Sequence, residues 1–292
     1  MAPSAPDILL AAVRVVCCQI APRVGELAYN RRLCAQAIRN AAQDGAQLVV
    51  LPELAQSGYV FANKAEALSL AEALDGTTLR EWQELAHELN LVLVAGFCEL
   101  LDGNELSNSA VLIDPTGVRS VYRKAHLWDQ EKRFFTPGHA SPPVIQTHLG
   151  RIGMVICYDL EFPEWVRLVA LQGAQLLCVP TNWPDGGHPT GERPSEVVRV
   201  QANAAFNRLF IAASGRCGTE RDVPWIGGSV IVDCDGYPVA GPLGPDAPGA
   251  VWVSLPLNDA DNKWVNANNH VLNDRRTDLY PASDTAFPRR SP

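Results

Sequence analysis

The sequence predicts a layered α/β fold, and two observations carry that prediction. Short apolar runs of the kind that form buried strands recur along the chain, and stretches with apolar residues at helical spacing separate most of them. Strands that alternate with helices are typical of α/β layers. No charge block, low-complexity tract or linker divides the 292 residues, so we expect a single domain over 1–292.

The first elements place a carboxylate at the end of a strand. Residues 13–20 are predicted to form a strand, and a helical pattern follows until Gly45 stops it. The run at 48–51 contains no polar residue, as expected of a strand buried on both faces, and Pro52 ends it. Glu53 therefore lies just beyond the carboxyl end of a buried strand.

A helix, a strand and a hairpin are predicted next. Thr78 and Glu81 form a capping-box pattern at the start of one apolar helical face. An apolar strand follows at 91–97, and an Asp-Pro-Thr-Gly turn within 109–122 predicts a hairpin. The stretch at 129–143 contains Pro-Gly and Pro-Pro pairs, so we expect a loop there.

The second half of the chain alternates strands and helices again. The predicted elements are strands at 152–156, 175–179, 209–213, 229–232 and 251–255 and helices at 164–173 and 196–207. A loop rich in Pro and Gly is expected at 182–194. From Asn258 onward the chain is polar and has no clear core period.

Composition and motifs exclude several classes of function. The chain has 24 Lys and Arg against 32 Asp and Glu, and its net charge of −8 argues against nucleic-acid or anionic-membrane partners. Met1 to Leu10 lacks the features of a signal peptide, and no apolar stretch is long enough to span a bilayer. The eight cysteines form no CxxC pair, which favours a reducing cytoplasm. Without P-loop, GxGxxG or HExxH motifs, we expect no cofactor and no metal.

Three reactive side chains each end a different predicted strand. Cys157 precedes a helix, where backbone N–H groups bind an oxyanion and the helix N-terminus lowers the pKa of a thiol. Glu53 and Lys124 also follow strands, and the carboxyl ends of parallel strands are where α/β sites gather. Taken alone, each has an ordinary explanation as a core thiol, a surface or capping carboxylate, or a solvated ammonium. Together they favour one shared catalytic site.

The segments around these residues resemble the three signature blocks of the nitrilase superfamily of carbon–nitrogen hydrolases. The blocks are Leu-Pro-Glu-Leu at 51–54 with Ser-Gly-Tyr at 57–59, Tyr-Arg-Lys-Ala-His-Leu at 122–127, and Cys-Tyr-Asp-Leu-Glu-Phe-Pro-Glu at 157–164. Further matches are Gln19, Pro22, Glu131 with the loop at 134–138, and Thr-Asn-Trp at 181–183. The resemblance covers about 13–256 and leaves 257–292 as a C-terminal tail.

The resemblance implies a four-layer αββα sandwich that packs into an eight-layer homodimer or a higher homo-oligomer. The helix from Glu164 and the polar tail are the implied contact elements. A small-molecule amide is the implied partner of the site.

The resemblance also implies a Glu-Lys-Cys triad. Cys157 would attack an amide carbonyl and form a thioester, with Glu53 as general base and acid. Lys124 and the backbone N–H of Tyr158 would stabilise the oxyanion. Glu131 matches the second glutamate of the family, which holds the lysine and orients substrate; a surface carboxylate is the alternative.

Residues after the cysteine indicate the substrate. Nitrile-cleaving members usually carry Trp-Glu there, whereas Tyr158 and Asp159 resemble the amidase-type branches. Hydrolases of N-carbamoyl-D-amino acids carry paired arginines where this chain has Leu160 and Glu161, which argues against an anionic substrate. Glu161 favours neutral or amine-bearing amides, or it serves the fold through a base such as Arg167.

The predicted pocket residues lie near the triad blocks, and they are Tyr59, Trp128, Glu161, Asn182 and Trp183. Packing in the core or an interface is the alternative for each aromatic. The loop at 182–191 is expected at the pocket rim. The sequence thus predicts a cysteine amidase for small aliphatic amides. The alternatives are a nitrilase or N-carbamoyl amine hydrolase of the same superfamily, a glutaminase-type module, and a non-catalytic binding or scaffold protein.

Overall fold

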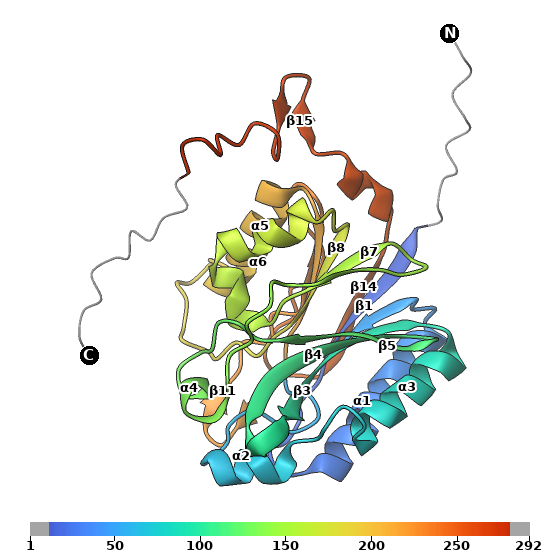
Figure 1. The fold of residues 1–292 in the computed structure, drawn as a ribbon, viewed down its shortest axis with the longest axis vertical. Coiled ribbons are helices and arrows are strands. Elements are labelled where there is room, and N and C mark those ends of the chain that lie inside the picture. The colour runs from blue at the N-terminus through green and yellow to red at the C-terminus, as the bar shows by residue number, and fades with distance from the viewer. Residues whose placement is uncertain (1–11, 281–292) are drawn as a thin grey trace, which may run out of the picture.

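The computed structural model describes residues 12–280, in which two six-stranded β-sheets pack face to face between two layers of helices (Figure 1). The predicted αββα sandwich is confirmed. Packing into an eight-layer dimer stays a prediction. Residues 1–10, where no signal peptide is expected, and the last part of the tail, 281–292, lie outside the described residues.

The first sheet joins strands from both ends of the described chain. Its order is β14-β1-β2-β3-β4-β5, and the bounds are β1 (Val13–Gln19), β2 (Leu48–Val50), β3 (Val92–Leu100), β4 (Leu106–Asp114), β5 (Gly117–Arg123) and β14 (Gly249–Leu255). β1 pairs in parallel with β2 and antiparallel with β14. The predicted hairpin is the antiparallel pair β4 and β5.

The second sheet comes from the second half of the chain. Its order is β13-β12-β9-β8-β7-β6, and the bounds are β6 (Val144–Gln146), β7 (Arg151–Met154), β8 (Leu176–Pro180), β9 (Phe210–Ser214), β12 (Val230–Val232) and β13 (Pro238–Ala240). Two small ribbons are β10 (Thr219–Glu220) with β11 (Val223–Pro224), and β15 (Trp264–Asn266) with β16 (Asn269–His270).

Helices cover the outer face of each sheet (Figure 1). α1 (Leu27–Gln43) and α3 (Thr77–Leu89) lie on the first sheet, and α5 (Pro163–Leu171) and α6 (Ser195–Asn207) lie on the second. Side chains of a strand alternate between the two faces of its sheet. In β1, Cys17 therefore packs between the sheets while Cys18 packs under the helices. Within residues 12–280, the structure contains no helix of the length and apolarity that crossing a membrane requires.

Some local elements differ from the sequence prediction. The sequence does not predict α2 (Lys64–Leu70), and α4 (Glu131–Phe134) forms a single turn inside the expected loop. The predicted capping box is wrong, because Thr78 lies inside α3 and donates its N–H and hydroxyl to Glu72. In the tail, the 3₁₀ helix η3 (Leu257–Asp261) buries apolar side chains against the sandwich core. A further 3₁₀ turn, η1 (Asp102–Asn104), joins β3 to β4.

Candidate active site

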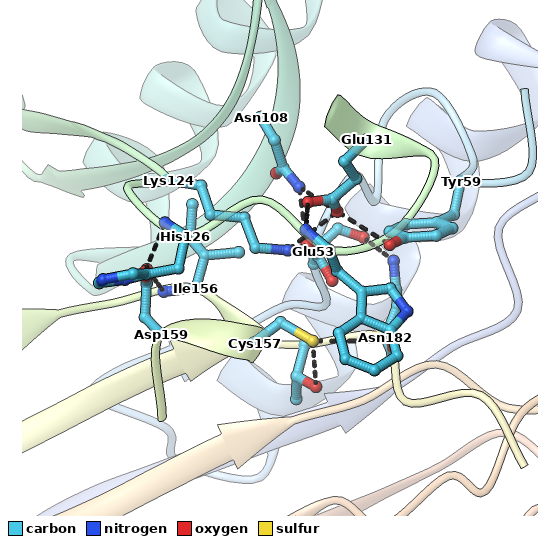
Figure 2. A network of polar contacts seen from close by, with 12 residues as sticks. Glu53, Tyr59, Asn108, Lys124, His126, Glu131, Ile156, Cys157, Asp159 and Asn182 are labelled. Atoms are coloured by element: carbon cyan, nitrogen blue, oxygen red, sulfur yellow. Dashed lines mark hydrogen bonds and ion pairs between the residues drawn. The ribbon is translucent and has the colours of Figure 1, made fainter. Parts of the chain in front are cut away.

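Three buried side chains meet where strands of the two sheets end (Figure 2). Glu53 follows β2 and Lys124 follows β5 of the first sheet, whereas Cys157 begins the 3₁₀ helix η2 (Cys157–Glu161) after β7 of the second. Glu53 and Lys124 are fully buried, and Cys157 is 7% exposed. The structure thus brings together the three reactive residues that the sequence singles out, at the seam between the sheets.

Lys124 bridges two carboxylates. Its Nζ donates to Glu53 Oε1 at 2.7 Å and to Glu131 Oε1 at 2.9 Å. Asn108, on β4, donates its Nδ2 to the same two oxygens at 2.7 and 3.0 Å. An ammonium carries three donor protons, and the carboxylates accept two of them. One N–H of Lys124 therefore remains to donate to a substrate oxygen.

The two glutamates differ in the oxygen that they leave available. Glu131 Oε1 also accepts from the hydroxyl of Tyr59 at 2.8 Å, and its Oε2 accepts from the backbone N–H of Trp128 at 2.8 Å. In contrast, Glu53 Oε2 is buried and has no hydrogen-bond partner among residues 12–280. Glu53 is therefore the carboxylate with an oxygen available to accept a proton, and Glu131 is held in place.

Burial and neighbouring charges set the protonation states of this cluster. Burial raises the pKa of Glu53 to about 7, and the charge of Glu131 adds to that rise while Lys124 opposes it. Burial by itself lowers the pKa of Lys124, but the carboxylates of Glu131 and Glu53 hold it above its ordinary value. Lys124 is thus protonated, and Glu53 is poised to exchange a proton near neutral pH.

Cys157 is held in a strained turn with its thiol protonated. Its φ of 45° lies in the left-handed region that residues with a side chain rarely adopt. Its Sγ accepts from Thr181 Oγ1 at 3.5 Å and donates to the backbone oxygen of Asn182 at 3.6 Å. Burial, followed by the charge of Glu53, raises the pKa of the thiol well above its ordinary value. The pKa of the thiol is therefore raised and not lowered as the sequence predicted, because burial has the largest effect on it.

The turn that follows Cys157 and the segment after β8 complete the surroundings of the thiol. In the part of the chain that the structure describes, the backbone N–H of Tyr158 has no hydrogen-bond acceptor. Asn182 donates its Nδ2 to the backbone oxygen of Glu53 at 2.8 Å, while its buried Oδ1 has no partner among the described residues. The N–H of Tyr158 and the Oδ1 of Asn182 are therefore two polar groups near the thiol without a partner among the described residues.

A small cavity of about 50 Å³ opens at the thiol, and it is lined by Trp128, Cys157, Tyr158, Glu161, Asn182, Trp183, Pro184 and Glu196. A second cavity of about 200 Å³ shares Trp128 and Pro184 with the first, and half of its lining residues are aromatic, Tyr59 among them. A third, of about 310 Å³, is lined by 184–188 together with Trp128 and Glu196. The predicted pocket residues thus lie around these cavities, with part of the predicted rim loop.

Glu161 forms an ion pair with a base, as one of the two interpretations of this residue allows. Its Oε2 lies 2.9 Å from Arg199 Nε on α6. Arg167 instead donates to the backbone oxygens of Val271 and Phe206. The alternative that Glu161 pairs with Arg167 or another base is therefore met by another base, Arg199, and not by Arg167.

Asp159 has a role that sequence reasoning missed. It is fully buried, and its Oδ1 accepts from the backbone N–H and the Nδ1 of His126, at 3.1 and 2.7 Å. Its Oδ2 accepts from the hydroxyl of Tyr122 at 2.7 Å and from the N–H of Ile156 at 3.0 Å. Figure 2 shows this carboxylate beside His126 and Ile156, on the far side of Lys124 from Glu131. Asp159 therefore ties the turn of the nucleophile to the segment that carries the lysine.

Comparisons with known proteins agree on one family. The family model described as carbon-nitrogen hydrolase matches residues 14–262. The chain is 33% identical over 270 residues to a nitrilase of Pyrococcus abyssi, a match that covers 92% of this chain and 99% of that protein. It is 37% identical over 216 residues to an (R)-stereoselective amidase of a Pseudomonas species, covering 74% of this chain and 75% of that protein.

Solved structures give the same result. A variant of the Nesterenkonia AN1 amidase from the nitrilase superfamily matches with a TM-score of 0.78 at 30% identity, covering 92% of this chain and 96% of that chain. Another structure of an amidase from Nesterenkonia sp. AN1 shows the result of Michael addition of acrylamide at its active-site cysteine.

Proposed function

The chain belongs to the carbon–nitrogen hydrolase family, and on that premise we propose that it is a cysteine-dependent amidase for small aliphatic amides, which it hydrolyses to the carboxylic acid and ammonia. The observation that carries the proposal is the pairing of a protonated thiol, Cys157, with a buried carboxylate, Glu53, whose Oε2 has no partner among residues 12–280. Lys124, which donates to both Glu53 and Glu131, has a third N–H that can donate to the carbonyl oxygen of the substrate.

The proposed acylation uses each of these groups once. As Sγ of Cys157 bonds to the amide carbonyl carbon, its proton passes to Oε2 of Glu53. The carbonyl oxygen becomes an oxyanion, which accepts from the third N–H of Lys124 and from the backbone N–H of Tyr158. Glu53 then gives its proton to the amide nitrogen, the C–N bond breaks, and ammonia leaves behind a thioester.

The proposed deacylation reverses the proton path. Glu53 accepts a proton from a water molecule, whose oxygen attacks the thioester carbon. The same donors stabilise the second oxyanion, and the C–S bond breaks as the sulfur recovers the proton from Glu53. The products are a carboxylic acid and the free thiol. Glu131 and Asn108 are positioning residues here, because their hydrogen bonds fix Lys124 and Glu53.

Amides are favoured over nitriles as the substrate. Tyr158 and Asp159 stand where the nitrile-cleaving branches usually carry Trp-Glu. A structural neighbour, from Nesterenkonia AN1, is an amidase from the nitrilase superfamily. The nitrilase from Pyrococcus abyssi keeps nitrile hydrolysis as the second candidate, and both substrates would use the same triad.

Ammonia release from pentanamide and pentanenitrile at neutral pH tests the proposal. We expect turnover of the amide, none with Cys157→Ala, and a loss of about 10²- to 10⁴-fold in kcat with Glu53→Gln. Cys178→Ala is the matched control, because that buried thiol on β8 does not line the three cavities around the candidate site. Turnover of the nitrile alone would establish the second candidate. No turnover of either substrate by folded protein would overturn both.

A further inference from the structure

The cavities around the thiol are lined by acidic residues. Glu161 and Glu196 line the cavity that holds Cys157, Asp129 and Glu131 line the aromatic one, and Asp185 lines the third. Of the described residues that line these three cavities, none is Lys or Arg. Any substrate that reaches the thiol therefore passes carboxylates before it meets a cation.

One arginine only partly balances the two carboxylates nearest the thiol. Arg199 lies behind them on α6, with Nε 2.9 Å from Glu161 Oε2 and Nη1 3.4 Å from Glu196 Oε1. These three side chains sum to one negative charge. Burial raises the pKa of Glu161, Arg199 opposes that rise, and the charge of Glu196 adds to it.

The triad contributes no unpaired positive charge that could bind a substrate carboxylate. Lys124 lies between Glu53 and Glu131, so that cluster also carries a net negative charge when both carboxylates are ionised. The raised pKa of Cys157 keeps the thiol neutral. A carboxylate on a substrate would therefore find no uncompensated cation within the site, whereas an ammonium would be attracted.

A separate observation points to a donor group on the ligand. Asn182 lines the cavity of Cys157 and is 2% exposed, yet its Oδ1 has no hydrogen-bond partner among residues 12–280. A buried acceptor without a donor is costly, and a ligand that brings an N–H removes that cost. The cavity thus offers acceptors at Asn182, Glu161 and Glu196.

The spacing suits a substrate with charge at one end and the amide at the other. Cys157 and Glu161 are the first and last residues of η2. A 3₁₀ helix rises about 2 Å per residue, which places the backbone of Glu161 about 6 Å along the helix axis from that of Tyr158, the neighbour of the nucleophile. An acyl chain of several methylenes, attached to the sulfur at one end, reaches that far.

We propose that the physiological substrates are aliphatic amides with an ammonium group at the far end of the acyl chain, and that Glu161 and Glu196 are the specificity-determining residues that bind it. This inference rests on the proposed amidase function and adds the charge of its substrate. Arg199 reduces the preference by partly neutralising both carboxylates.

Three amides that differ mainly in their terminal group test this inference. They are 5-aminopentanamide, which is a cation at neutral pH, neutral pentanamide and anionic glutaramate. Initial rates of ammonia release at low salt give kcat/KM for each. We expect kcat/KM for 5-aminopentanamide to exceed that for glutaramate by on the order of ten-fold, because one net negative charge acts on the substrate over several ångströms in a partly solvated site.

If the inference is right, removing a carboxylate lowers the preference for the cation and removing Arg199 raises it. Glu161→Gln and Glu196→Gln each remove a negative charge, so each is expected to lower the ratio of cation to neutral amide several-fold. The double variant leaves Arg199 unpaired and is expected to favour glutaramate, whereas Arg199→Gln is expected to raise the preference for the cation. Glu84→Gln, an equal loss of charge at an exposed position on α3, serves as the control and leaves the ratio unchanged.

The outcomes separate this inference from the amidase proposal. Hydrolysis of pentanamide with no preference for the cation, or with a preference that the Glu161 and Glu196 variants leave intact, would overturn the inference while the amidase proposal stands. Failure to hydrolyse any of the three would overturn the amidase proposal. In that case, calorimetric binding to Cys157→Ala decides: tighter binding of 5-aminopentanamide than of glutaramate supports the charge preference, and equal or weaker binding rejects it.

Discussion

Glu53 is the residue whose titration sets the lower limit of the expected pH range. Its pKa is raised to about 7 by burial and by the charge of Glu131. Because only the ionised carboxyl accepts the proton of the thiol, kcat/KM for an amide is expected to fall about ten-fold per pH unit below about pH 7. Glu131→Gln removes a charge that raises this pKa, so the acid limb is expected to move to lower pH.

The measurement is the pH dependence of kcat/KM for wild type, Glu131→Gln and Glu84→Gln. The Glu131 variant is also expected to lower kcat, because Lys124 loses one of its two carboxylate partners. Glu84→Gln, on the exposed side of α3, is the control for a simple change of net charge. An acid limb that stays in place in Glu131→Gln would show that Glu131 does not act on the pKa of Glu53.

At the residue scale, sequence reasoning found the side chains that carry reactive groups and missed those that hold them. Glu53, Lys124, Glu131 and Cys157 lie in recognisable blocks, and the structure brings them together. Asn108 has no such block, and its role depends on β4 lying beside β5. Asn108 is the middle residue of a Ser-Asn-Ser run at 107–109 before an apolar stretch, and this polar run at one end of a strand was the signal available for it.

At the scale of elements, Asp159 connects η2 to the segment after β5. All four of its contacts are donors, at His126, Tyr122 and Ile156, so Asp159→Asn would place an amide N–H₂ against groups that need an acceptor. We expect a loss of about 1–3 kcal/mol in unfolding free energy. We also expect kcat to fall at least about ten-fold, because Lys124 and Cys157 lose their fixed relation.

Asp114→Asn is the matched control for this prediction. Asp114 is also a buried carboxylate that accepts from a backbone N–H, a hydroxyl and an arginine, but it is the last residue of β4, just before the turn to β5. Urea unfolding and steady-state kinetics on both variants separate stability from positioning. Equal kcat in the two variants, at the same folded fraction, would limit Asp159 to a structural role.

Single-turn elements are what the sequence predicted least well. α4 forms one turn around Glu131 because the Oε2 of that residue accepts from the N–H of Trp128, a contact that depends on the tertiary site. η3 buries Leu257 and Ala260 in a stretch with no core period of its own. Long amphipathic helices such as α1 and α3 were predictable, since each buries one regular apolar face.

At the scale of the molecule, the outer face of the second helix layer is expected to pair with a second copy. Four large apolar side chains are exposed on α5 and α6, and they are Leu168, Leu171, Val198 and Phe206. Exposed apolar side chains grouped on one face favour an interface. α5 is also the helix that the sequence analysis predicts as a dimer contact.

Light scattering after size exclusion checks this expectation. Wild type is expected at twice the chain mass or more, and Phe206→Glu with Leu171→Glu is expected to shift it to the monomer, because the charges would be buried without partners. Leu74→Glu is the control, since Leu74 is equally apolar and exposed but lies outside α5 and α6. A wild type that runs as a monomer would reject the predicted dimer.

The sandwich as a whole was predictable only through the resemblance, because strand order leaves no mark in local sequence. The apolar run at 251–255 indicated a strand, but nothing in it indicated pairing with β1. β1 and β14 lie in the same sheet, but along the chain they are the first and the last strand of the sandwich. Their pairing therefore depends on all the elements between them being in place.

The pairing of β1 with β14 also delays completion of the first sheet during synthesis on the ribosome. β1 emerges first, whereas β14 is made after every residue of the candidate site. Until then, one edge of β1 offers unpaired N–H and carbonyl groups, and such an edge recruits strands from other chains. A nascent chain can thus hold its whole catalytic apparatus and still be prone to aggregate, so the interval before Gly249–Leu255 emerges is when a chaperone is most needed.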